Sequence, residues 1–186
     1  ESSSQEGVKY LNLPADRCIN ISTDADIQFK KIEISHSAEQ TVRSKYSLQR
    51  PFIMYTGGID HRKNIEGFIR AYALLPDNER EGNQLAIVCS VQDHARSLLE
   101  LLADKVGLKE SDLILTGFVP EEDLITLYNL CAVFVFPSWH EGFGLPALEA
   151  MRCGAPVIAA NSSSLPEVVG LDDALFDPHS DQDLAS

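Results

Sequence analysis

Short apolar runs alternate with segments of helical periodicity from residue 51 onward, and this alternation constrains the fold more than any other feature. The apolar runs are residues 52–55, 85–89, 113–115, 132–136, 156–159 and 175–176. Helical patterns lie between them at residues 65–75, 95–106, 121–130, 146–152 and 164–167. Strands that are apolar on both faces and alternate with helices are typical of a parallel sheet covered on both sides. The sequence therefore predicts an α/β fold with a doubly wound, Rossmann-like parallel sheet.

Residues 1–50 are polar and only partly patterned. They predict a short helix at residues 4–13, a short strand at residues 18–21 and a weak helical pattern over residues 35–50. We interpret residues 1–50 as a lead-in or interdomain segment, and residues 51–186 as the folded domain. At residues 164–167, the pattern Ser-Leu-Pro-Glu has the spacing of a capping box at the start of a short helix.

The charge balance and the cysteines limit the classes of partner. The chain has 28 acidic and 15 basic residues in 186, and its net charge is −13. Such a surface repels phosphate backbones, so we expect no nucleic-acid partner. No apolar run approaches the ~20 residues of a membrane span. The four cysteines are widely spaced without a C-x-x-C pair, which argues against structural zinc and disulfides and favours a reducing cytoplasm. Because the chain opens at Glu1, we expect a piece of a longer protein.

The loop after the first predicted strand combines glycines with cations. Gly57 and Gly58 follow the strand, and Arg62 and Lys63 precede the next helix. The glycines allow a ligand to approach the backbone closely, and a helix N-terminus favours anions, so the loop could hold a diphosphate. It is neither a P-loop nor a G-x-G-x-x-G fingerprint. A plain strand-to-helix turn with solvated charges is the alternative.

The loop after the strand at residues 132–136 carries a stronger signal. It contains Gly142 and Gly144 and leads directly into a predicted helix. The backbone amides of Phe143, Gly144 and Leu145 then lie just before or at the helix start, which is a natural anion site.

Two glutamates accompany this loop, with seven residues between them. Glu141 lies in the loop and Glu149 in the helix. Eight residues of one helix rotate by about 80° beyond two turns, so the pair would not share a face well as an acid/base pair. Carboxylates that accept hydrogen bonds from sugar or ribose hydroxyls are as reasonable as a proton shuttle, and Glu149 could also be a charge in an early helix turn. Phe118 follows another strand, where it could face a ligand base or pack in the core.

Together these segments resemble the group 1 retaining glycosyltransferases of the GT-B fold. The resemblance rests on residues 57–64, 117–120, 141–151, 154–159 and 163–167. Within it, the two glutamates separated by seven residues are a family signature. The resemblance covers about residues 10–180. It implies one half of a two-domain architecture, in which two Rossmann-like domains face each other across a cleft.

The resemblance implies that residues 51–186 are the C-terminal domain, which binds the nucleotide-diphosphate sugar, with its final helix truncated. Arg62, Lys63 and Glu141 would carry catalysis, because the cations neutralise the departing diphosphate while Glu141 faces the transferred sugar. The donor-binding positions would be Gly57, Gly58, Phe118, Gly142, Phe143, Gly144, Leu145 and Glu149. Among them, the two early glycines approach the diphosphate, Phe118 meets the base through its backbone, and the loop amides face sugar hydroxyls and phosphate. Glu149 would bind the ribose hydroxyls.

The activity implied by the resemblance is a hexosyltransferase. It would move a mannose- or glucose-type sugar from a donor such as GDP-mannose or a UDP-sugar to an acceptor sugar or glycoconjugate. An N-terminal domain outside this chain would hold the acceptor, so we expect the isolated chain to be inactive. We expect no cofactor and no metal, since cationic side chains can stabilise the leaving group. We expect a cytoplasmic protein, and peripheral membrane association of the intact protein stays open.

One departure from the family and one alternative function accompany this interpretation. Many members of the family carry arginine directly after the first glycine of the early loop, where this chain has Gly58.

The alternative function is a non-catalytic nucleotide-binding α/β module. Such a module needs the cations and a ribose-binding carboxylate but has no need for Glu141, so the joint presence of Arg62, Lys63, Glu141 and Glu149 separates the two hypotheses.

Overall fold

The computed structural model describes all of residues 1–186 and contains one central six-stranded sheet. The strands are β1 Phe52–Thr56, β2 Gln84–Val88, β3 Leu113–Leu115, β4 Val133–Phe136, β5 Val157–Ala160 and β6 Leu175–Phe176. All pairings are parallel, and the strand order is β3-β2-β1-β4-β5-β6. The predicted doubly wound α/β sheet is therefore confirmed, with strand bounds within about one residue of those predicted.

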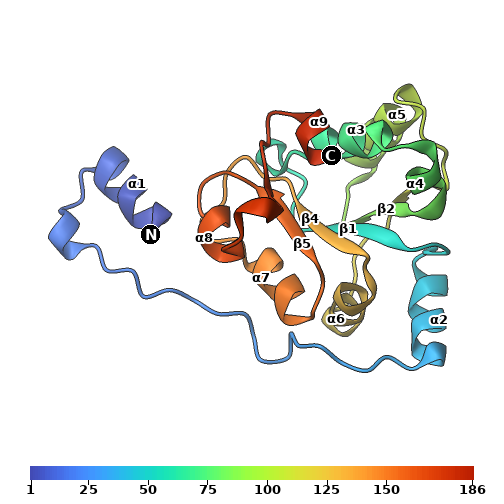
Figure 1. Ribbon diagram of the computed structural model, residues 1–186, viewed down its shortest axis with the longest axis horizontal. Coiled ribbons are helices and arrows are strands. Elements are labelled where there is room, and N and C mark those ends of the chain that lie inside the picture. The colour runs from blue at the N-terminus through green and yellow to red at the C-terminus, as the bar shows by residue number, and fades with distance from the viewer.

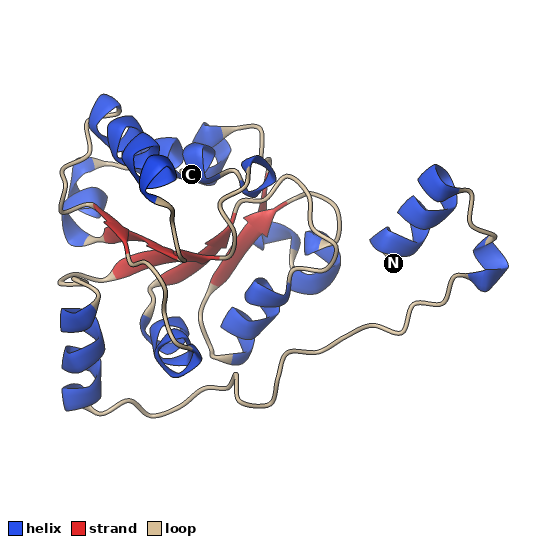
Figure 2. Ribbon diagram, turned by 180° about the vertical axis from the view of Figure 1, so that it is seen from behind, coloured by secondary structure: helices blue, strands red, loops and turns tan.

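Helices cover both faces of the sheet (Figures 1 and 2). The helices of the chain are α1 Ser2–Leu11, α2 His36–Lys45, α3 Ile65–Leu74, α4 Asp77–Gly82, α5 Asp93–Lys105, α6 Glu121–Leu130, α7 Leu145–Arg152, α8 Leu165–Val169 and α9 Asp181–Leu184, with 3₁₀ turns at Ala15–Arg17 (η1), His61–Lys63 (η2) and Asp172–Ala174 (η3). Helix α3 packs against α5 and α9 on one face, while α2, α6, α7 and α8 form a contiguous layer on the other. Helix α4 follows Pro76, in a stretch where the sequence predicts no helix.

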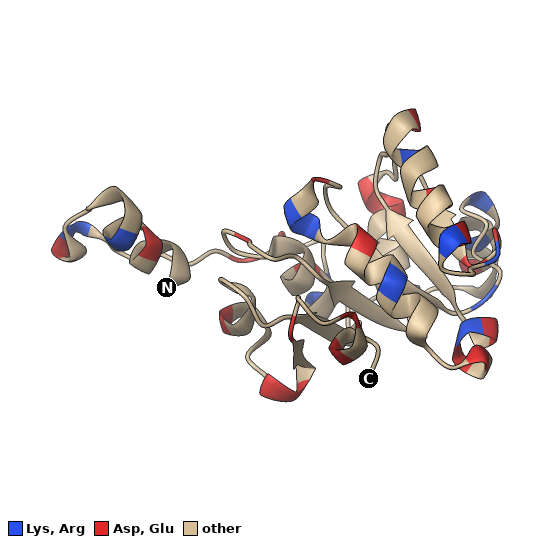
Figure 3. Ribbon diagram, turned by 90° about the horizontal axis from the view of Figure 1, so that it is seen from above, with Lys and Arg blue, Asp and Glu red and all other residues tan.

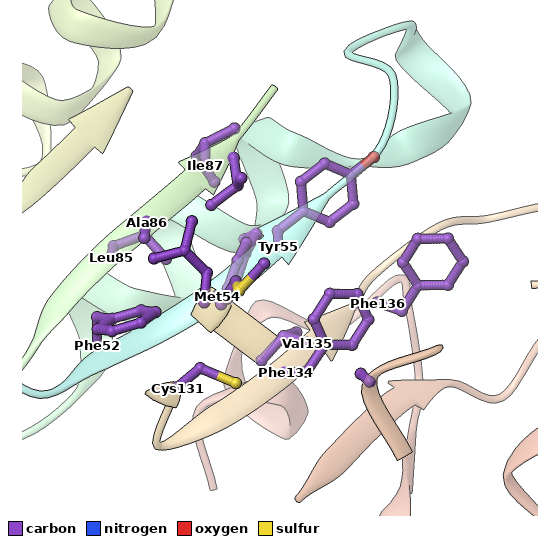
Figure 4. Packing of buried hydrophobic residues seen from close by; sticks show 14 of the residues in the cluster. Phe52, Met54, Tyr55, Leu85, Ala86, Ile87, Cys131, Phe134, Val135 and Phe136 are labelled. Carbon is purple, nitrogen blue, oxygen red and sulfur yellow. The ribbon is translucent and has the colours of Figure 1, made fainter. Parts of the chain in front are cut away.

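The core consists of the apolar strands and the helix faces that cover them (Figure 4). The central strands β1, β2 and β4 contribute fully or almost fully buried side chains to both faces, which is why their runs are continuously apolar. Aromatic rings stack in the core, with Tyr55 of β1 and Phe136 of β4 at 5.9 Å between centroids and Phe134 and Phe136 of β4 also at 5.9 Å. Buried side chains of this size contribute about 1.5–3 kcal/mol each to folding.

Residues 1–50 divide into two parts. The second part joins the core, because α2 packs on α6 and Val42, Tyr46 and Leu48 are buried ahead of the boundary expected at residue 51. The first part carries α1, which lies apart from the sheet and is joined to α2 by a long extended segment (Figure 1). The strand predicted at residues 18–21 is wrong. That segment pairs with no other strand, and Ile19 and Ile21 are 80% and 89% exposed.

The strand order reverses between β1 and β4, because the chain winds to β2 and β3 on one side and to β5 and β6 on the other. In open parallel sheets, ligands bind beyond the carboxyl ends of the strands at this switch point. The loops that follow β1 and β4 are the two loops that carry most of the predicted site residues.

The charged residues are spread over the molecule. Figure 3 shows Lys and Arg positions scattered among Asp and Glu positions along the ribbon. No helix has both the length and the apolar character that crossing a membrane requires.

Candidate functional site

The turn after β1 needs glycine at its first position. Gly57 has a φ of 145°, and a Cβ added there would lie 2.6 Å from the hydroxyl oxygen of Tyr55. That hydroxyl donates a hydrogen bond of 2.6 Å to the carbonyl of Gly58. Tyr55 is fully buried in β1, so the core fixes the backbone of the loop. A side chain at residue 57 is excluded by both the positive φ and the close tyrosine oxygen.

Hydrogen bonds join the loops that follow β1 and β4. Asn64 is buried in the left-handed conformation, with φ 54°, and its side-chain amide donates to the carbonyls of Pro137 and Pro178 at 3.2 and 3.1 Å. The backbone N–H of Trp139 donates to the carbonyl of Arg62 at 2.8 Å. Asn64 was not among the predicted site residues. The sequence feature that could have identified it is an asparagine directly before a helix, because asparagine tolerates positive φ.

The predicted cations and the first glutamate meet directly. Lys63 Nζ lies 2.5 Å from Glu141 Oε1, and the two side chains are only 10% and 9% exposed. Arg62 Nη1 lies 3.4 Å from Glu141 Oε2 and donates to the carbonyl of His140 at 3.2 Å. Lys63 Nζ also lies 5.5 Å from the centroid of the Phe136 ring. Residues 78 positions apart in sequence are therefore brought together at the switch point.

Both cations have carboxylate partners within the chain. Arg62 Nε lies 3.0 Å from Asp60 Oδ1, and Glu141 contacts both Lys63 and Arg62. Two basic and two acidic side chains thus give this cluster no net charge. The alternative of a turn with solvated charges does not describe Lys63, which is buried against a carboxylate. Asp60 was not among the predicted site residues.

Three consecutive serines hold the Glu141 loop. The backbone N–H of Glu141 donates to Ser163 Oγ at 2.8 Å, and the Ser162 hydroxyl donates to the carbonyl of Trp139. The buried Ser164 hydroxyl donates to the carbonyls of Glu141 and Phe143 at 3.1 and 2.7 Å. The capping box predicted at residues 164–167 is therefore wrong, since Ser164 makes no side-chain cap to α8. The sequence feature that could have identified these serines is their position directly after β5, because the carboxyl ends of parallel strands lie at the same edge of the sheet.

Gly144 determines where α7 begins. It has a φ of 105°, and a Cβ there would lie 2.6 Å from Leu165 Cδ2. The helix starts at Leu145, so the amides of Phe143 and Gly144 lie just before the helix start and that of Leu145 lies at it, as predicted, beside the exposed Gly142. The eight-residue helix aligns its free N–H groups toward the loop that carries Glu141.

Glu149 has a different environment from Glu141. It lies on α7, half-buried, and the Tyr128 hydroxyl of α6 donates to its Oε2 at 3.0 Å. Burial raises the pKa of Glu149, and the hydrogen bond from Tyr128 opposes that shift. The two glutamates thus have separate partners, a lysine and an arginine for one and a tyrosine for the other. The sequence analysis did not single out Tyr128.

Phe118 and a cluster around Trp139 complete this edge. Phe118 follows β3 and is 77% exposed, so it does not pack in the core. Trp139 donates from Nε1 to the carbonyl of Pro178 at 3.1 Å, and its ring centroid lies 4.5 Å from that of His61 and 6.1 Å from that of His179. Trp139 is therefore engaged in packing.

A cavity of about 850 Å³ adjoins the second loop. Its lining combines Gly142, Phe143 and Leu148 with residues of the first 24 positions, and it includes none of Arg62, Lys63, Glu141 or Glu149. The Ser3 hydroxyl donates to the carbonyl of Gly142 at 2.9 Å, which brings α1 to this loop.

A parallel α/β sheet with this strand order, and with a cation–carboxylate cluster at its switch point, defines a protein of the Rossmann-like class. Comparison with known proteins then specifies the family. The chain belongs to the glycosyl transferases group 1 family, whose model matches residues 38–186.

Its relatives include two proteins of Escherichia coli. The chain is 46% identical over 184 residues to the serotype-specific mannosyltransferase WbdA, covering 99% of this chain and 23% of that protein. It is 38% identical to O-antigen chain mannosyltransferase B over 95% of this chain and 46% of that protein. The chain therefore spans a quarter to a half of the length of these two relatives.

The solved structures show the same architecture. Sucrose-phosphate synthase of Thermosynechococcus elongatus superimposes with a TM-score of 0.78 at 26% identity, over 99% of this chain and 45% of that one. The expected half of a GT-B architecture is thereby confirmed.

Proposed function

We propose that this chain is the donor-binding domain of a retaining mannosyltransferase that uses a nucleotide-diphosphate sugar. The observation that carries the proposal is the convergence of Arg62, Lys63 and Glu141 at the switch point, next to the first turn of α7. The choice of mannose over the other sugars considered rests on the names of the two Escherichia coli relatives.

The proposed chemistry follows from where charge develops. The bond that breaks joins the anomeric carbon of the sugar to a phosphate oxygen, and negative charge grows on that oxygen as the bond stretches. Fixed cations and helix-start amides stabilise such a charge in the transition state. Arg62 and Lys63 would supply the cations, and Phe143, Gly144 and Leu145 the amides. This arrangement needs neither a cofactor nor a metal ion. Retention of configuration is part of the proposal, supported by family resemblance alone.

The other site residues take roles that fit their positions. Gly57 and Gly58 leave room for the diphosphate beside the loop backbone, and Glu141 faces the transferred sugar. Glu149 uses its second carboxylate oxygen for ribose hydroxyls, since Tyr128 donates to the first. Phe118 is exposed after β3 and would face the base. The acceptor would be held by an N-terminal domain, and the cavity beside Gly142 and Phe143 is where it would approach the donor.

The proposal is tested by calorimetric titration of the chain with GDP, UDP and ADP and with their sugar conjugates. We expect one nucleoside diphosphate to bind, and Lys63→Ala to weaken that binding about tenfold or more, because a charge-assisted contact to phosphate is lost. Lys109→Ala is the matched control, since Lys109 is exposed and lies outside the cluster. The affinity of this variant for the nucleoside diphosphate should stay at the wild-type value. Absence of binding at millimolar concentration would contradict the proposal, as would an unchanged affinity in Lys63→Ala.

The non-catalytic binding module is tested by the same experiments in combination with a donor panel on the intact protein. A module would bind nucleotide through Lys63 and Glu149 without any requirement for Glu141. Loss of sugar transfer in the intact Glu141→Ala variant, with its fold retained, would exclude that alternative.

A further inference from the structure

Glu141 occupies the cationic groups that the proposed function assigns to a diphosphate. Its two carboxylate oxygens contact Lys63 at 2.5 Å and Arg62 at 3.4 Å. The ammonium of Lys63 has three N–H donors, so a phosphate oxygen can reach it beside Glu141, but the two anions then repel each other at close range. Binding of a phosphate at Lys63 therefore favours displacement of the Glu141 carboxylate. The inference rests on the proposed function, and it concerns how the site distinguishes one ligand from another.

The burial of the pair makes this exchange demanding. Lys63 and Glu141 are about nine-tenths buried, so water can replace neither partner well. Removing one partner of a buried ion pair leaves an uncompensated charge, which is strongly unfavourable. An incoming anion satisfies Lys63, but the displaced Glu141 carboxylate then needs new hydrogen-bond donors.

A sugar supplies those donors and a bare diphosphate does not. The hydroxyls of a hexose can donate to the displaced carboxylate, whereas the terminal phosphate of a nucleoside diphosphate offers acceptors and further negative charge. We propose that Glu141 is an internal competitor for Lys63, which makes the site favour the sugar-bearing donor over the spent nucleoside diphosphate. After transfer, the carboxylate returns to Lys63 and displaces the product.

Asp60 provides the matched comparison within the same cluster. It pairs with Arg62 at 3.0 Å, but both side chains are about half-exposed. An exposed ion pair contributes little, since water screens it and replaces either partner. Asp60 carries the same charge as Glu141 and lies at the same loop cluster, but it should not compete strongly with a ligand.

The experiment compares wild type, Glu141→Gln and Asp60→Asn by calorimetry, using GDP and GDP-mannose, or UDP and UDP-glucose if the panel selects uridine. Glutamine keeps the size of Glu141 and removes its charge. We expect Glu141→Gln to bind the bare nucleoside diphosphate about tenfold more tightly than wild type, with the sugar conjugate changed less than about threefold. Asp60→Asn should change both affinities less than about twofold.

A wild-type measurement decides the proposal even if Glu141→Gln fails to fold. Wild type should bind the sugar conjugate more tightly than the bare diphosphate, although the bare ligand carries more negative charge. Equal or tighter binding of the bare ligand overturns the inference, as does unchanged or weaker binding of it by folded Glu141→Gln. Equal tightening in Asp60→Asn also overturns it, because a general charge effect then explains the result. If wild type binds no nucleotide, the proposed function is contradicted, and so is this inference.

Discussion

At the scale of single residues, the hydroxyl of Tyr128 sets the direction in which Glu149 can accept hydrogen bonds. Tyr128 is fully buried and donates to Oε2 of Glu149, so the carboxylate cannot rotate freely. The proposed ribose contact depends on this orientation as much as on the carboxylate itself. Sequence spacing identified Glu149 but not Tyr128, because the two residues lie on different helices.

We expect Tyr128→Phe to weaken nucleoside diphosphate binding about fivefold and to reduce the preference for ribose over 2′-deoxyribose. The ring still packs in the core, but Glu149 loses the donor that orients it. Calorimetry with GDP and 2′-deoxy-GDP, or with the corresponding pair of the base selected, measures both effects.

Tyr46→Phe is the control for this variant. The hydroxyl of Tyr46, which directly follows α2, also donates to a carboxylate, that of Asp123 on α6 at 2.6 Å, away from the loops of the site. It should leave nucleotide affinity unchanged. Equal losses in the two variants, or an unchanged ribose preference in Tyr128→Phe, would contradict the positioning role.

Glu149 also carries a prediction about stability and pH. Burial raises the pKa of Glu149 above its ordinary value of 4.5, so its ionised form is less favourable in the folded than in the unfolded chain. That cost is absent when both states are protonated, and it develops as the pH rises through the raised pKa. We therefore expect Glu149→Gln to melt a few degrees higher than wild type at pH 7, with the difference vanishing below pH 4.5. A lower melting temperature for Glu149→Gln at pH 7 in calorimetric scans would show that burial is not the dominant effect.

At the scale of elements, most helices and strands follow from local pattern, and the exceptions are instructive. The extent of α6, Glu121–Leu130, was predicted to the residue, because its acidic first turn and the following strand mark both ends. The prediction of a strand at residues 18–21 is wrong, because a strand needs a neighbouring strand for its backbone hydrogen bonds and apolar alternation does not provide one. The serine at residue 164 satisfies the sequence rule for a cap, yet its hydroxyl bonds to the Glu141 loop.

This difference at Ser164 can be tested by replacing it with another favourable N-cap residue. Aspartate caps helices as well as serine does, but it cannot donate to the carbonyls of Glu141 and Phe143. We expect Ser164→Asp to lower the free energy of unfolding by about 2–4 kcal/mol, since it also buries a charge. Denaturant unfolding measures the loss.

Ser35→Asp is the comparison for this substitution. Ser35 is exposed and accepts a hydrogen bond from the backbone N–H of Ala38 at the start of α2, as a helix cap does. Aspartate can replace it there at little cost. If Ser164→Asp proved as stable as Ser35→Asp, the role of Ser164 in holding the loop would be refuted.

At the scale of the whole molecule, the chain covers 23% of WbdA. The proposed activity needs an acceptor that is positioned against the donor sugar. In the proposed function, this chain supplies the loop edge that carries Lys63 and Glu141, and a domain outside it would hold the acceptor.

We expect the 186-residue chain to bind nucleoside diphosphate but to transfer no sugar to an acceptor. Without a positioned acceptor, the reacting atoms lose the effective concentration that the intact site provides. Mass spectrometry of acceptor incubated with GDP-mannose and the chain measures transfer, and the intact protein serves as the positive control. Accumulation of glycosylated acceptor with the chain alone would be the contrary result.

The sequence by itself determined the α/β class, the positions of most strands, the two loops of the site and the family, because apolar periodicity, glycines and charged residues act over a few positions. The tertiary structure decided which groups meet across those loops. It alone shows that Glu141 neutralises Lys63, that Tyr128 holds Glu149 and that Ser164 holds the Glu141 loop. Such contacts join residues 21 to 78 positions apart, and their strength depends on burial, which a local pattern does not contain.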